Sequence, residues 1–273
     1  MADLARLSIN QATTREQHSL AEAITAYSEA DVAGISIWRD KLAECGVDEA
    51  VRMLADSDLR VSGLCRGGSF PAADAAGRQA SLDDNRAAID DAAALGADCL
   101  VLVAGGMPEG SKDLAGAREM IRDGIADMLP HARANNVPLA IEPLHPMYAA
   151  DRCAINTLSQ ALDICDELGE GIGVAVDVYH LWWDPNLQAQ IARAGKRVVA
   201  YHVCDWLVPT TDLLLDRGMM GDGVIDIQQI SSWIESTGYD GLIEVEIFSA
   251  HNWWKRPGDE VIRICRERFQ ETV

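Results

Sequence analysis

The sequence lacks long apolar runs and paired cysteine motifs. None of the apolar stretches in its 273 residues approaches the roughly 20 needed to span a membrane. The opening residues, MADLARLSIN, lack the apolar core of a signal peptide. The seven cysteines are odd in number and form no C-x-x-C pair, which indicates reduced thiols. We therefore expect a cytoplasmic protein with no membrane partner.

Basic residues are also scarce. The chain has 23 lysines and arginines against 43 acidic residues, a formal net charge of −20 at pH 7. This charge repels phosphate backbones, so we expect no nucleic-acid partner. The first apolar segment is not followed by the G-x-G-x-x-G that marks many dinucleotide-binding sheets. The two glycines of LVAGG, residues 102–106, predict only a tight turn.

Short β-branched segments instead alternate with longer alanine-rich ones. In the longer segments, such as 14–30, 78–96 and 158–169, apolar residues recur at spacings of three and four, which is typical of one buried helix face. Apolar strands alternating with helices predict a parallel sheet covered by helices. Eight such strands favour a single (β/α)8 barrel over residues 1–273, with a doubly wound open sheet as the alternative. The predicted strands are 5–10, 33–38, 60–65, 98–104, 137–143, 172–178, 197–204 and 242–248.

In a barrel of this kind, functional side chains gather at the C-terminal ends of the strands. Polar residues are dense at these predicted ends, whereas the opposite ends, such as Val137 and Ile172, are apolar. The candidates at the C-terminal ends are Asn10, Trp38, Arg39, Arg66, Glu142, His145, Asp177, His180, His202, Asp205, Glu244 and Glu246.

Four of these candidates form a possible metal site. They are Glu142, Asp177, His202 and Glu246. They come from four successive strands, and three carboxylates with one imidazole suit Mn²⁺, Mg²⁺ or Co²⁺. A buried carboxylate cluster needs compensating charge, which a divalent cation supplies. Glu244 is an alternative to Glu246, because the two-residue period of a strand places both on one side. Four separate polar strand ends, each satisfied by loop backbone, are the other interpretation.

Five motifs give nearly the whole chain a resemblance to a known superfamily. They are IEPLHP, VDVYH, YHVCDW, GDGVID and EVEIF. In this order they resemble the motifs of the xylose-isomerase-like barrels, and most of all those of the sugar isomerases and epimerases. The D-x-x-H of Asp177 to His180 is the most specific of these elements.

The resemblance implies roles for individual residues. It implies that the four candidate ligands bind one divalent ion, for which we expect Mn²⁺ ahead of Mg²⁺ or Co²⁺, and it favours Glu246 over Glu244. It also implies that Glu142 and Glu246 act as an acid/base pair on opposite faces of a bound ketose, and that His180 contacts a substrate oxygen. Because such relatives are often dimers or larger, a homo-oligomer is expected.

The proposed metal site and acid/base pair also make chemical sense without the resemblance. A metal bound to a carbonyl and its neighbouring hydroxyl acidifies the C–H between them by stabilising an enediolate. One carboxylate can remove that proton and a second can return it. Return to the adjacent carbon gives isomerisation, and return to the opposite face gives epimerisation. If a leaving group lies β to the carbonyl, the same carbanion expels it.

Two departures from the epimerase pattern leave the substrate open. Ketose epimerases commonly carry an arginine six residues after the histidine of strand seven, where this chain has Val208. They also carry a second acid shortly after the glutamate of strand five, where this chain has His145. The P-L-H-P loop resembles more closely the catalytic subunits of bacterial C-glycoside deglycosidases. These lyases perform β-elimination on 3-keto-glycosides and pair with a small second subunit. His145 is therefore a candidate catalytic base, with a loop histidine capped by backbone as the alternative.

The remaining candidates would contact a carbohydrate substrate. They are Trp38, Arg39, Arg66, Asp205 and Arg217. Indole faces stack on sugar rings, and arginine forks suit carboxylates or phosphates, although Arg39 and Arg66 could instead pair with acids of the chain. The segment DRGMMGDG, residues 216–223, predicts a mobile loop over the barrel mouth.

Two other classes of protein are disfavoured. Apurinic endonucleases share this superfamily, but they use several zinc ions and a basic groove, which the charge of −20 does not supply. A binding protein on a decayed barrel would have lost metal ligands, and all four are present. We therefore expect an enzyme.

Overall fold

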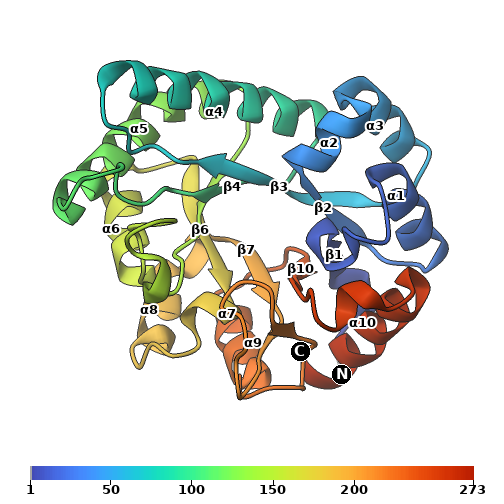
Figure 1. Ribbon diagram of the computed structural model, residues 1–273. Coiled ribbons are helices and arrows are strands. Elements are labelled where there is room, and N and C mark those ends of the chain that lie inside the picture. Colours follow the sequence, from blue (N-terminus) through green and yellow to red (C-terminus); the bar gives the residue numbers. More distant parts are fainter. Residues whose placement is uncertain (1) are drawn as a thin grey trace.

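Eight parallel strands close into a barrel in the computed structural model, which describes residues 2–273 (Figure 1). The order around the barrel is β1, β10, β7, β6, β5, β4, β3 and β2. This closure confirms the predicted (β/α)8 barrel and excludes the open sheet. The barrel strands are β1 (Leu7–Asn10), β2 (Gly34–Trp38), β3 (Arg60–Gly68), β4 (Leu100–Val103), β5 (Leu139–Ile141), β6 (Ile172–Asp177), β7 (Val198–Val203) and β10 (Ile243–Val245).

Helices surround the barrel on its outer face (Figure 1). The last of them packs against β1, so the C-terminal segment closes the ring beside the start of the chain. Among the described helices, none combines the length and apolar character that a membrane crossing needs. The helices are α1 (Leu20–Glu29), α2 (Arg39–Cys45), α3 (Val47–Ala55), α4 (Ala75–Leu95), α5 (Leu114–Ala134), α6 (Leu158–Leu168), α7 (Val178–Leu181), α8 (Leu187–Ala194), α9 (Ile227–Ser236) and α10 (Gly258–Thr272).

Local signals explain where the helices begin and end. α1 starts after a capping box in which Ser19 and Glu22 each bond to the other's backbone, so it begins later than the pattern at residue 14 predicts. The residues before it, Gln11–Thr14, form a short 3-10 helix. At its other end, α4 stops at Gly96, whose φ of 64° is left-handed and favours glycine. The three predicted helices are confirmed, with shifted ends.

Successive side chains of a strand point to opposite faces of the sheet, so the strands contribute to two separate clusters of buried side chains. Leu64, Leu100 and Leu139 belong to the large core that includes residues of the surrounding helices. The residues next to these three leucines, together with alanines of β6 and β7, form a second, smaller cluster that joins adjacent strands. Its members are Cys65, Cys99, Val101, Ala140, Ala175 and Ala200. Because most of these side chains are small, the barrel interior leaves room for polar groups near its C-terminal end.

The connection between β7 and α9 contains a two-stranded hairpin that the sequence does not predict. In it, β8 (Asp205–Trp206) pairs antiparallel with β9 (Arg217–Gly218). We expected residues 216–223 to form a mobile loop over the mouth, but Arg217, Met219 and Met220 are buried there. The first half of this segment is therefore part of the packed structure.

Asp205 fixes the path of this connection. Its buried carboxylate accepts backbone N–H bonds from four residues at 2.8–3.0 Å. The donors are Trp206, Gly221, Gly223 and Ile225. We expected Asp205 to contact substrate, but its oxygens are engaged in holding the loop.

Replacing Asp205 with Asn should destabilise the protein by about 2 kcal/mol, because an amide nitrogen would then face backbone donors in a buried site. Urea unfolding followed by circular dichroism measures this loss. Asp83→Asn is the matched control, since Asp83 forms an exposed pair with Arg86 and should change stability by less than about 0.5 kcal/mol. Equal stabilities for the two variants would contradict the structural role of Asp205.

Candidate metal centre and active site

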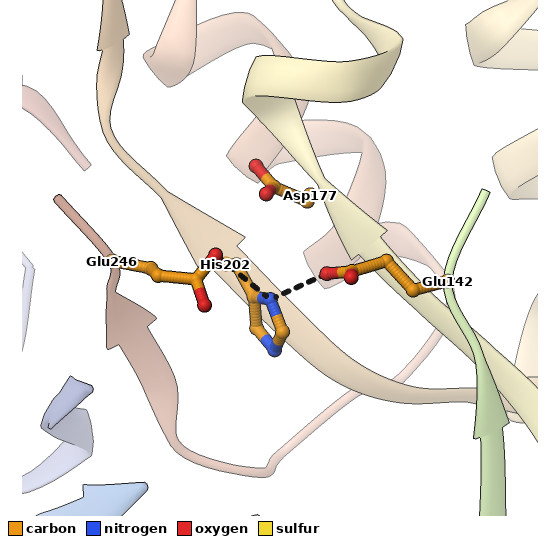
Figure 2. A group of neighbouring side chains, drawn as sticks. All are labelled: Glu142, Asp177, His202 and Glu246. Atoms are coloured by element: carbon orange, nitrogen blue, oxygen red, sulfur yellow. Dashed lines mark hydrogen bonds and ion pairs between the residues drawn. The ribbon is translucent and has the colours of Figure 1, made fainter. Parts of the chain in front are cut away.

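Four buried polar side chains meet at the C-terminal end of the barrel (Figure 2). They follow or end four neighbouring strands, β5, β6, β7 and β10. One possible ligand atom from each lies within 4.8 Å of the others. The four are Glu142, Asp177, His202 and Glu246. The structure thus brings together the four residues that we selected as metal-ligand candidates.

His202 lies between the two glutamates, which approach it from opposite sides (Figure 2). Its Nδ1 atom lies 3.1 Å from Glu142 Oε1 and 3.9 Å from Glu246 Oε2. Asp177 Oδ1 accepts the N–H of Tyr179 at 2.8 Å, which caps the short helix α7 and orients the carboxylate. Backbone capping therefore fixes one carboxylate of the cluster before any ion is bound.

Glu244 is buried below the cluster, on the other side of the histidine ring. Its Oε2 atom lies 3.4 Å from His202 Nε2, and β10 places it directly beside His202 in register. Asn10 Nδ2 donates to Glu244 at 3.3 Å and to Glu246 at 3.0 Å, which links the two acids. A Cβ at Gly63 would lie 3.2 Å from Glu244 Oε1, so the glycine leaves the space for this carboxylate. Glu246 therefore belongs to the cluster, whereas Glu244 lies two residues earlier on the strand and contacts the other ring nitrogen of His202. The sequence spacing alone could not distinguish the two.

Arg217 reaches the cluster from strand β9. Its Nη1 atom donates to Asp177 Oδ2 and to Glu246 Oε2, both at 3.0 Å. Its Nη2 atom lies 3.2 Å from His180 Nε2. Val208, at the position where epimerases carry an arginine, is 71% exposed and lies away from the cluster. The connection after β7 thus brings an arginine to the site from a position further along the chain than Val208.

Burial and mutual repulsion set the protonation of Glu246. Burial raises its pKa most, the neighbouring Glu142 raises it further, and Arg217 and His202 oppose the rise. The resulting pKa is about 8. This is the expected response of a buried acid that has other carboxylates beside it.

The other groups respond to the same surroundings. Burial alone would raise the pKa of Asp177, but Arg217, His180 and His202 hold it below its ordinary value. Burial lowers the pKa of His180 to about 3, so this imidazole is neutral. Burial would also lower the pKa of His202, but Glu244 and the other acids raise it well above its ordinary value.

The donor set fits a divalent cation. Three carboxylates and one imidazole are the hard, oxygen-rich ligands that Mn²⁺, Mg²⁺ and Zn²⁺ accept in catalytic sites. Buried acids held this close together are costly without compensation, and with Glu244 counted four acids surround two positively charged groups, His202 and Arg217. The chemistry of these residues, together with their spacing, supports a metal centre.

A narrow cavity of about 40 Å³ opens above the cluster. This space holds only a few water molecules, so a sugar at the cluster would extend beyond it toward the barrel mouth. The cavity wall includes Glu142, Glu246 and five of the residues that border them. The five are Trp38, Arg66, Tyr148, His180 and Phe248. Tyr148 and Phe248 were not among our candidates, because neither carries a polar pattern that the sequence could reveal.

Four of the predicted substrate contacts line this cavity: Trp38, Arg66, His180 and Arg217. The structure does not bring Arg39 to the cavity. Its guanidinium forms a two-pronged pair with Asp84 at 2.8 and 2.9 Å, on the outer helices. This pairing with an acid of the chain is the alternative that we left open for Arg39.

His145 also lies outside the cavity wall. Its ring stacks on Trp206 with the centroids 5.2 Å apart and meets the edge of Trp183 at 5.7 Å. Its Nδ1 atom accepts the N–H of Met147 at 3.2 Å, and its own N–H donates to His180 Nδ1 at 3.3 Å. The geometry thus fits a loop histidine with a backbone cap that supports His180.

A closed (β/α)8 barrel whose strand ends gather three carboxylates and a histidine defines a class of barrel that can hold a catalytic metal. The chain belongs to the xylose isomerase-like TIM barrel family, whose model matches residues 24–268. This confirms the resemblance drawn from the motifs.

Individual relatives extend this comparison. The chain is 61% identical to the solved structure of protein SMc04130 from Sinorhizobium meliloti 1021, over 99% of both chains with a TM-score of 0.98. It is 20% identical to the IOLI protein, solved with a binding zinc atom, over 98% of both chains with a TM-score of 0.85. It is 24% identical to the inosose isomerase of Bacillus velezensis over 164 residues, so the match spans 57% of that relative's length.

We expect the purified protein to bind one divalent ion and His202→Ala to lose it, because the variant removes the only imidazole of the cluster. Plasma mass spectrometry of the dialysed proteins measures the bound metal. Added Mn²⁺ should stabilise the parent by about 2.7 kcal/mol at a hundredfold excess over its Kd, but not the variant. His131→Ala, on the outer face of α5, is the control. Full metal occupancy in His202→Ala would place the ligands elsewhere.

Proposed function

We propose that the protein is a divalent-metal-dependent sugar isomerase or epimerase that moves a proton beside a substrate carbonyl. The observation that carries this proposal is the pair Glu142 and Glu246, two buried carboxylates that face each other across His202 at the floor of the cavity (Figure 2). The inosose isomerase relative and the family membership support the reaction class. Mn²⁺ as the natural metal and a cytoplasmic location remain predictions.

The two glutamates would divide the proton transfer between them. Since they follow β5 and β10 and approach His202 from opposite sides, a ketose bound above the His202 ring would expose one face to each glutamate. One carboxylate removes the proton beside the carbonyl and the other returns a proton to the opposite face or the adjacent carbon. When bound by the four ligands, a divalent ion would acidify this C–H by polarising the carbonyl.

His180 would orient the substrate. This neutral imidazole belongs to the cavity wall, where its Nδ1 atom faces the His145 N–H at 3.3 Å and its Nε2 atom faces Arg217 Nη2 at 3.2 Å. A neutral imidazole carries one N–H and one acceptor nitrogen, so the ring can bond to a carbonyl or hydroxyl oxygen of the sugar. Arg217 lies beside it and offers a charged donor to the same oxygens. Both groups are buried, so they enter the reaction already positioned.

The lyase alternative required His145 as a base over the substrate. Its ring is instead packed against Trp206 and Trp183, and its Nδ1 atom is occupied by a backbone N–H. This placement favours isomerisation or epimerisation over β-elimination on 3-keto-glycosides. A homo-oligomer, or assembly with a small second subunit, stays a prediction.

Glu246→Gln should lower kcat by about 10² or more, because the amide cannot exchange a proton with the substrate. The reaction is followed by NMR in D₂O with a panel of ketoses and inososes, and the parent should introduce deuterium beside the carbonyl. Bound metal is measured in parallel, and Glu267→Gln, in an exposed pair with Arg263 on α10, is the control. Parental turnover without deuterium incorporation would instead indicate a hydride shift.

His145→Ala should keep kcat within about threefold of the parent and leave the metal content unchanged, since His145 contacts His180 through its backbone N–H. Steady-state kinetics at saturating substrate measures this. A loss of turnover comparable to that of Glu246→Gln would restore His145 as a catalytic base and favour the lyase.

A further inference from the structure

Two arginines at the cavity mouth have no acidic partner. Arg66 lies at a bulge within β3, and Arg152 lies in the connection between β5 and α6. Within residues 2–273, neither forms an ion pair, although the chain has 43 acidic residues and most of its other arginines are paired. A pair of cations left uncompensated in so acidic a protein requires a reason.

Both arginines lie on the route from the metal cluster to solvent. Each lines the central cavity of about 40 Å³ and also an adjoining outer hollow of about 530 Å³. A substrate with its carbonyl at the cluster would therefore pass its far end between them. The guanidinium of Arg152 lies 5.2 Å from the centre of the Tyr148 ring, which supports the side chain on an aromatic face.

The surroundings of Arg66 favour an added anion. It is partly buried, and both burial and the positive charge of Arg152 lower its pKa. The negative charge of Glu142 raises the pKa of Arg66, but this carboxylate is engaged with His202, whose Nδ1 atom lies 3.1 Å away. Glu109 and Asp151 line the outer hollow, yet neither forms an ion pair with either arginine. An anionic group between the two guanidiniums would relieve their repulsion.

We propose that Arg66 and Arg152 form an anion subsite, so that the substrate is a keto sugar with a phosphate or carboxylate at the end remote from its carbonyl. This rests on the proposed function for the orientation of the sugar. Guanidinium forks bind both kinds of oxyanion in a two-pronged manner, and two of them at one mouth would bind the anionic end of a substrate.

The test compares three sugars that share one carbon skeleton: D-fructose, D-fructose 6-phosphate and D-fructuronate. Isothermal titration calorimetry with the Mn²⁺-loaded protein should show at least one acidic sugar binding about tenfold or more tightly than D-fructose. Arg66→Gln and Arg152→Gln should each remove most of this preference, measured in each variant as the ratio of the Kd for D-fructose to the Kd for the acidic sugar. Arg78→Gln, an exposed arginine of α4 that lies outside both hollows, is the charge-matched control.

The results distinguish a phosphate from a carboxylate ligand, and they test the anion subsite separately from the proposed isomerase or epimerase reaction. Preference for the phosphorylated sugar or for the acid sugar identifies which group the subsite takes. Equal binding of all three sugars, no binding of either acidic sugar at millimolar concentration, or an equal loss in Arg78→Gln overturns the subsite. Deuterium incorporation from D₂O is measured separately on the same sugars: its absence with a retained anion preference would overturn the proposed reaction and leave the subsite standing.

Discussion

The structure depends on the burial of three carboxylates around one point. Glu142, Asp177 and Glu246 would repel one another in a region from which water is largely excluded, so each must be offset by nearby positive charge. His202 lies between the two glutamates, and Arg217 bonds to the other face of the cluster. With Glu244 included, four acidic side chains surround only these two positively charged groups. A divalent cation at the centre would supply the missing positive charge.

This constraint extends into the barrel and its loops. The small side chains of the inner cluster leave room for acids near the strand ends, and Gly63 makes space for Glu244. Asp205 holds four backbone N–H groups of the connection after β7, and that connection delivers Arg217. A residue that does not line the cavity therefore determines where a buried cation lies. At the mouth, Arg66 of β3 and Arg152 of the connection after β5 form no ion pair with any other described residue.

The sequence predicts the barrel and its cluster because both follow from regular patterns. Alternating strands and helices determine the closed sheet, and the ends of parallel strands meet at one rim, so Glu142, Asp177 and His202 converge. The orientation of loop side chains is harder to predict, because the two-residue alternation that orients side chains along a strand stops where the strand ends. Asp205 and His145 follow strand ends as the cluster residues do, yet their loops turn them toward backbone and aromatic partners.

The most direct test of the central claim is the location of the metal. Crystals grown with Mn²⁺ should give one strong anomalous difference peak at the manganese edge, within about 2.5 Å of atoms from Glu142, Asp177, His202 and Glu246. Arg217 should move away from Asp177 and Glu246 as the ion takes over their charge. A peak at another place, or no peak at this cluster in fully soaked crystals, would contradict the account.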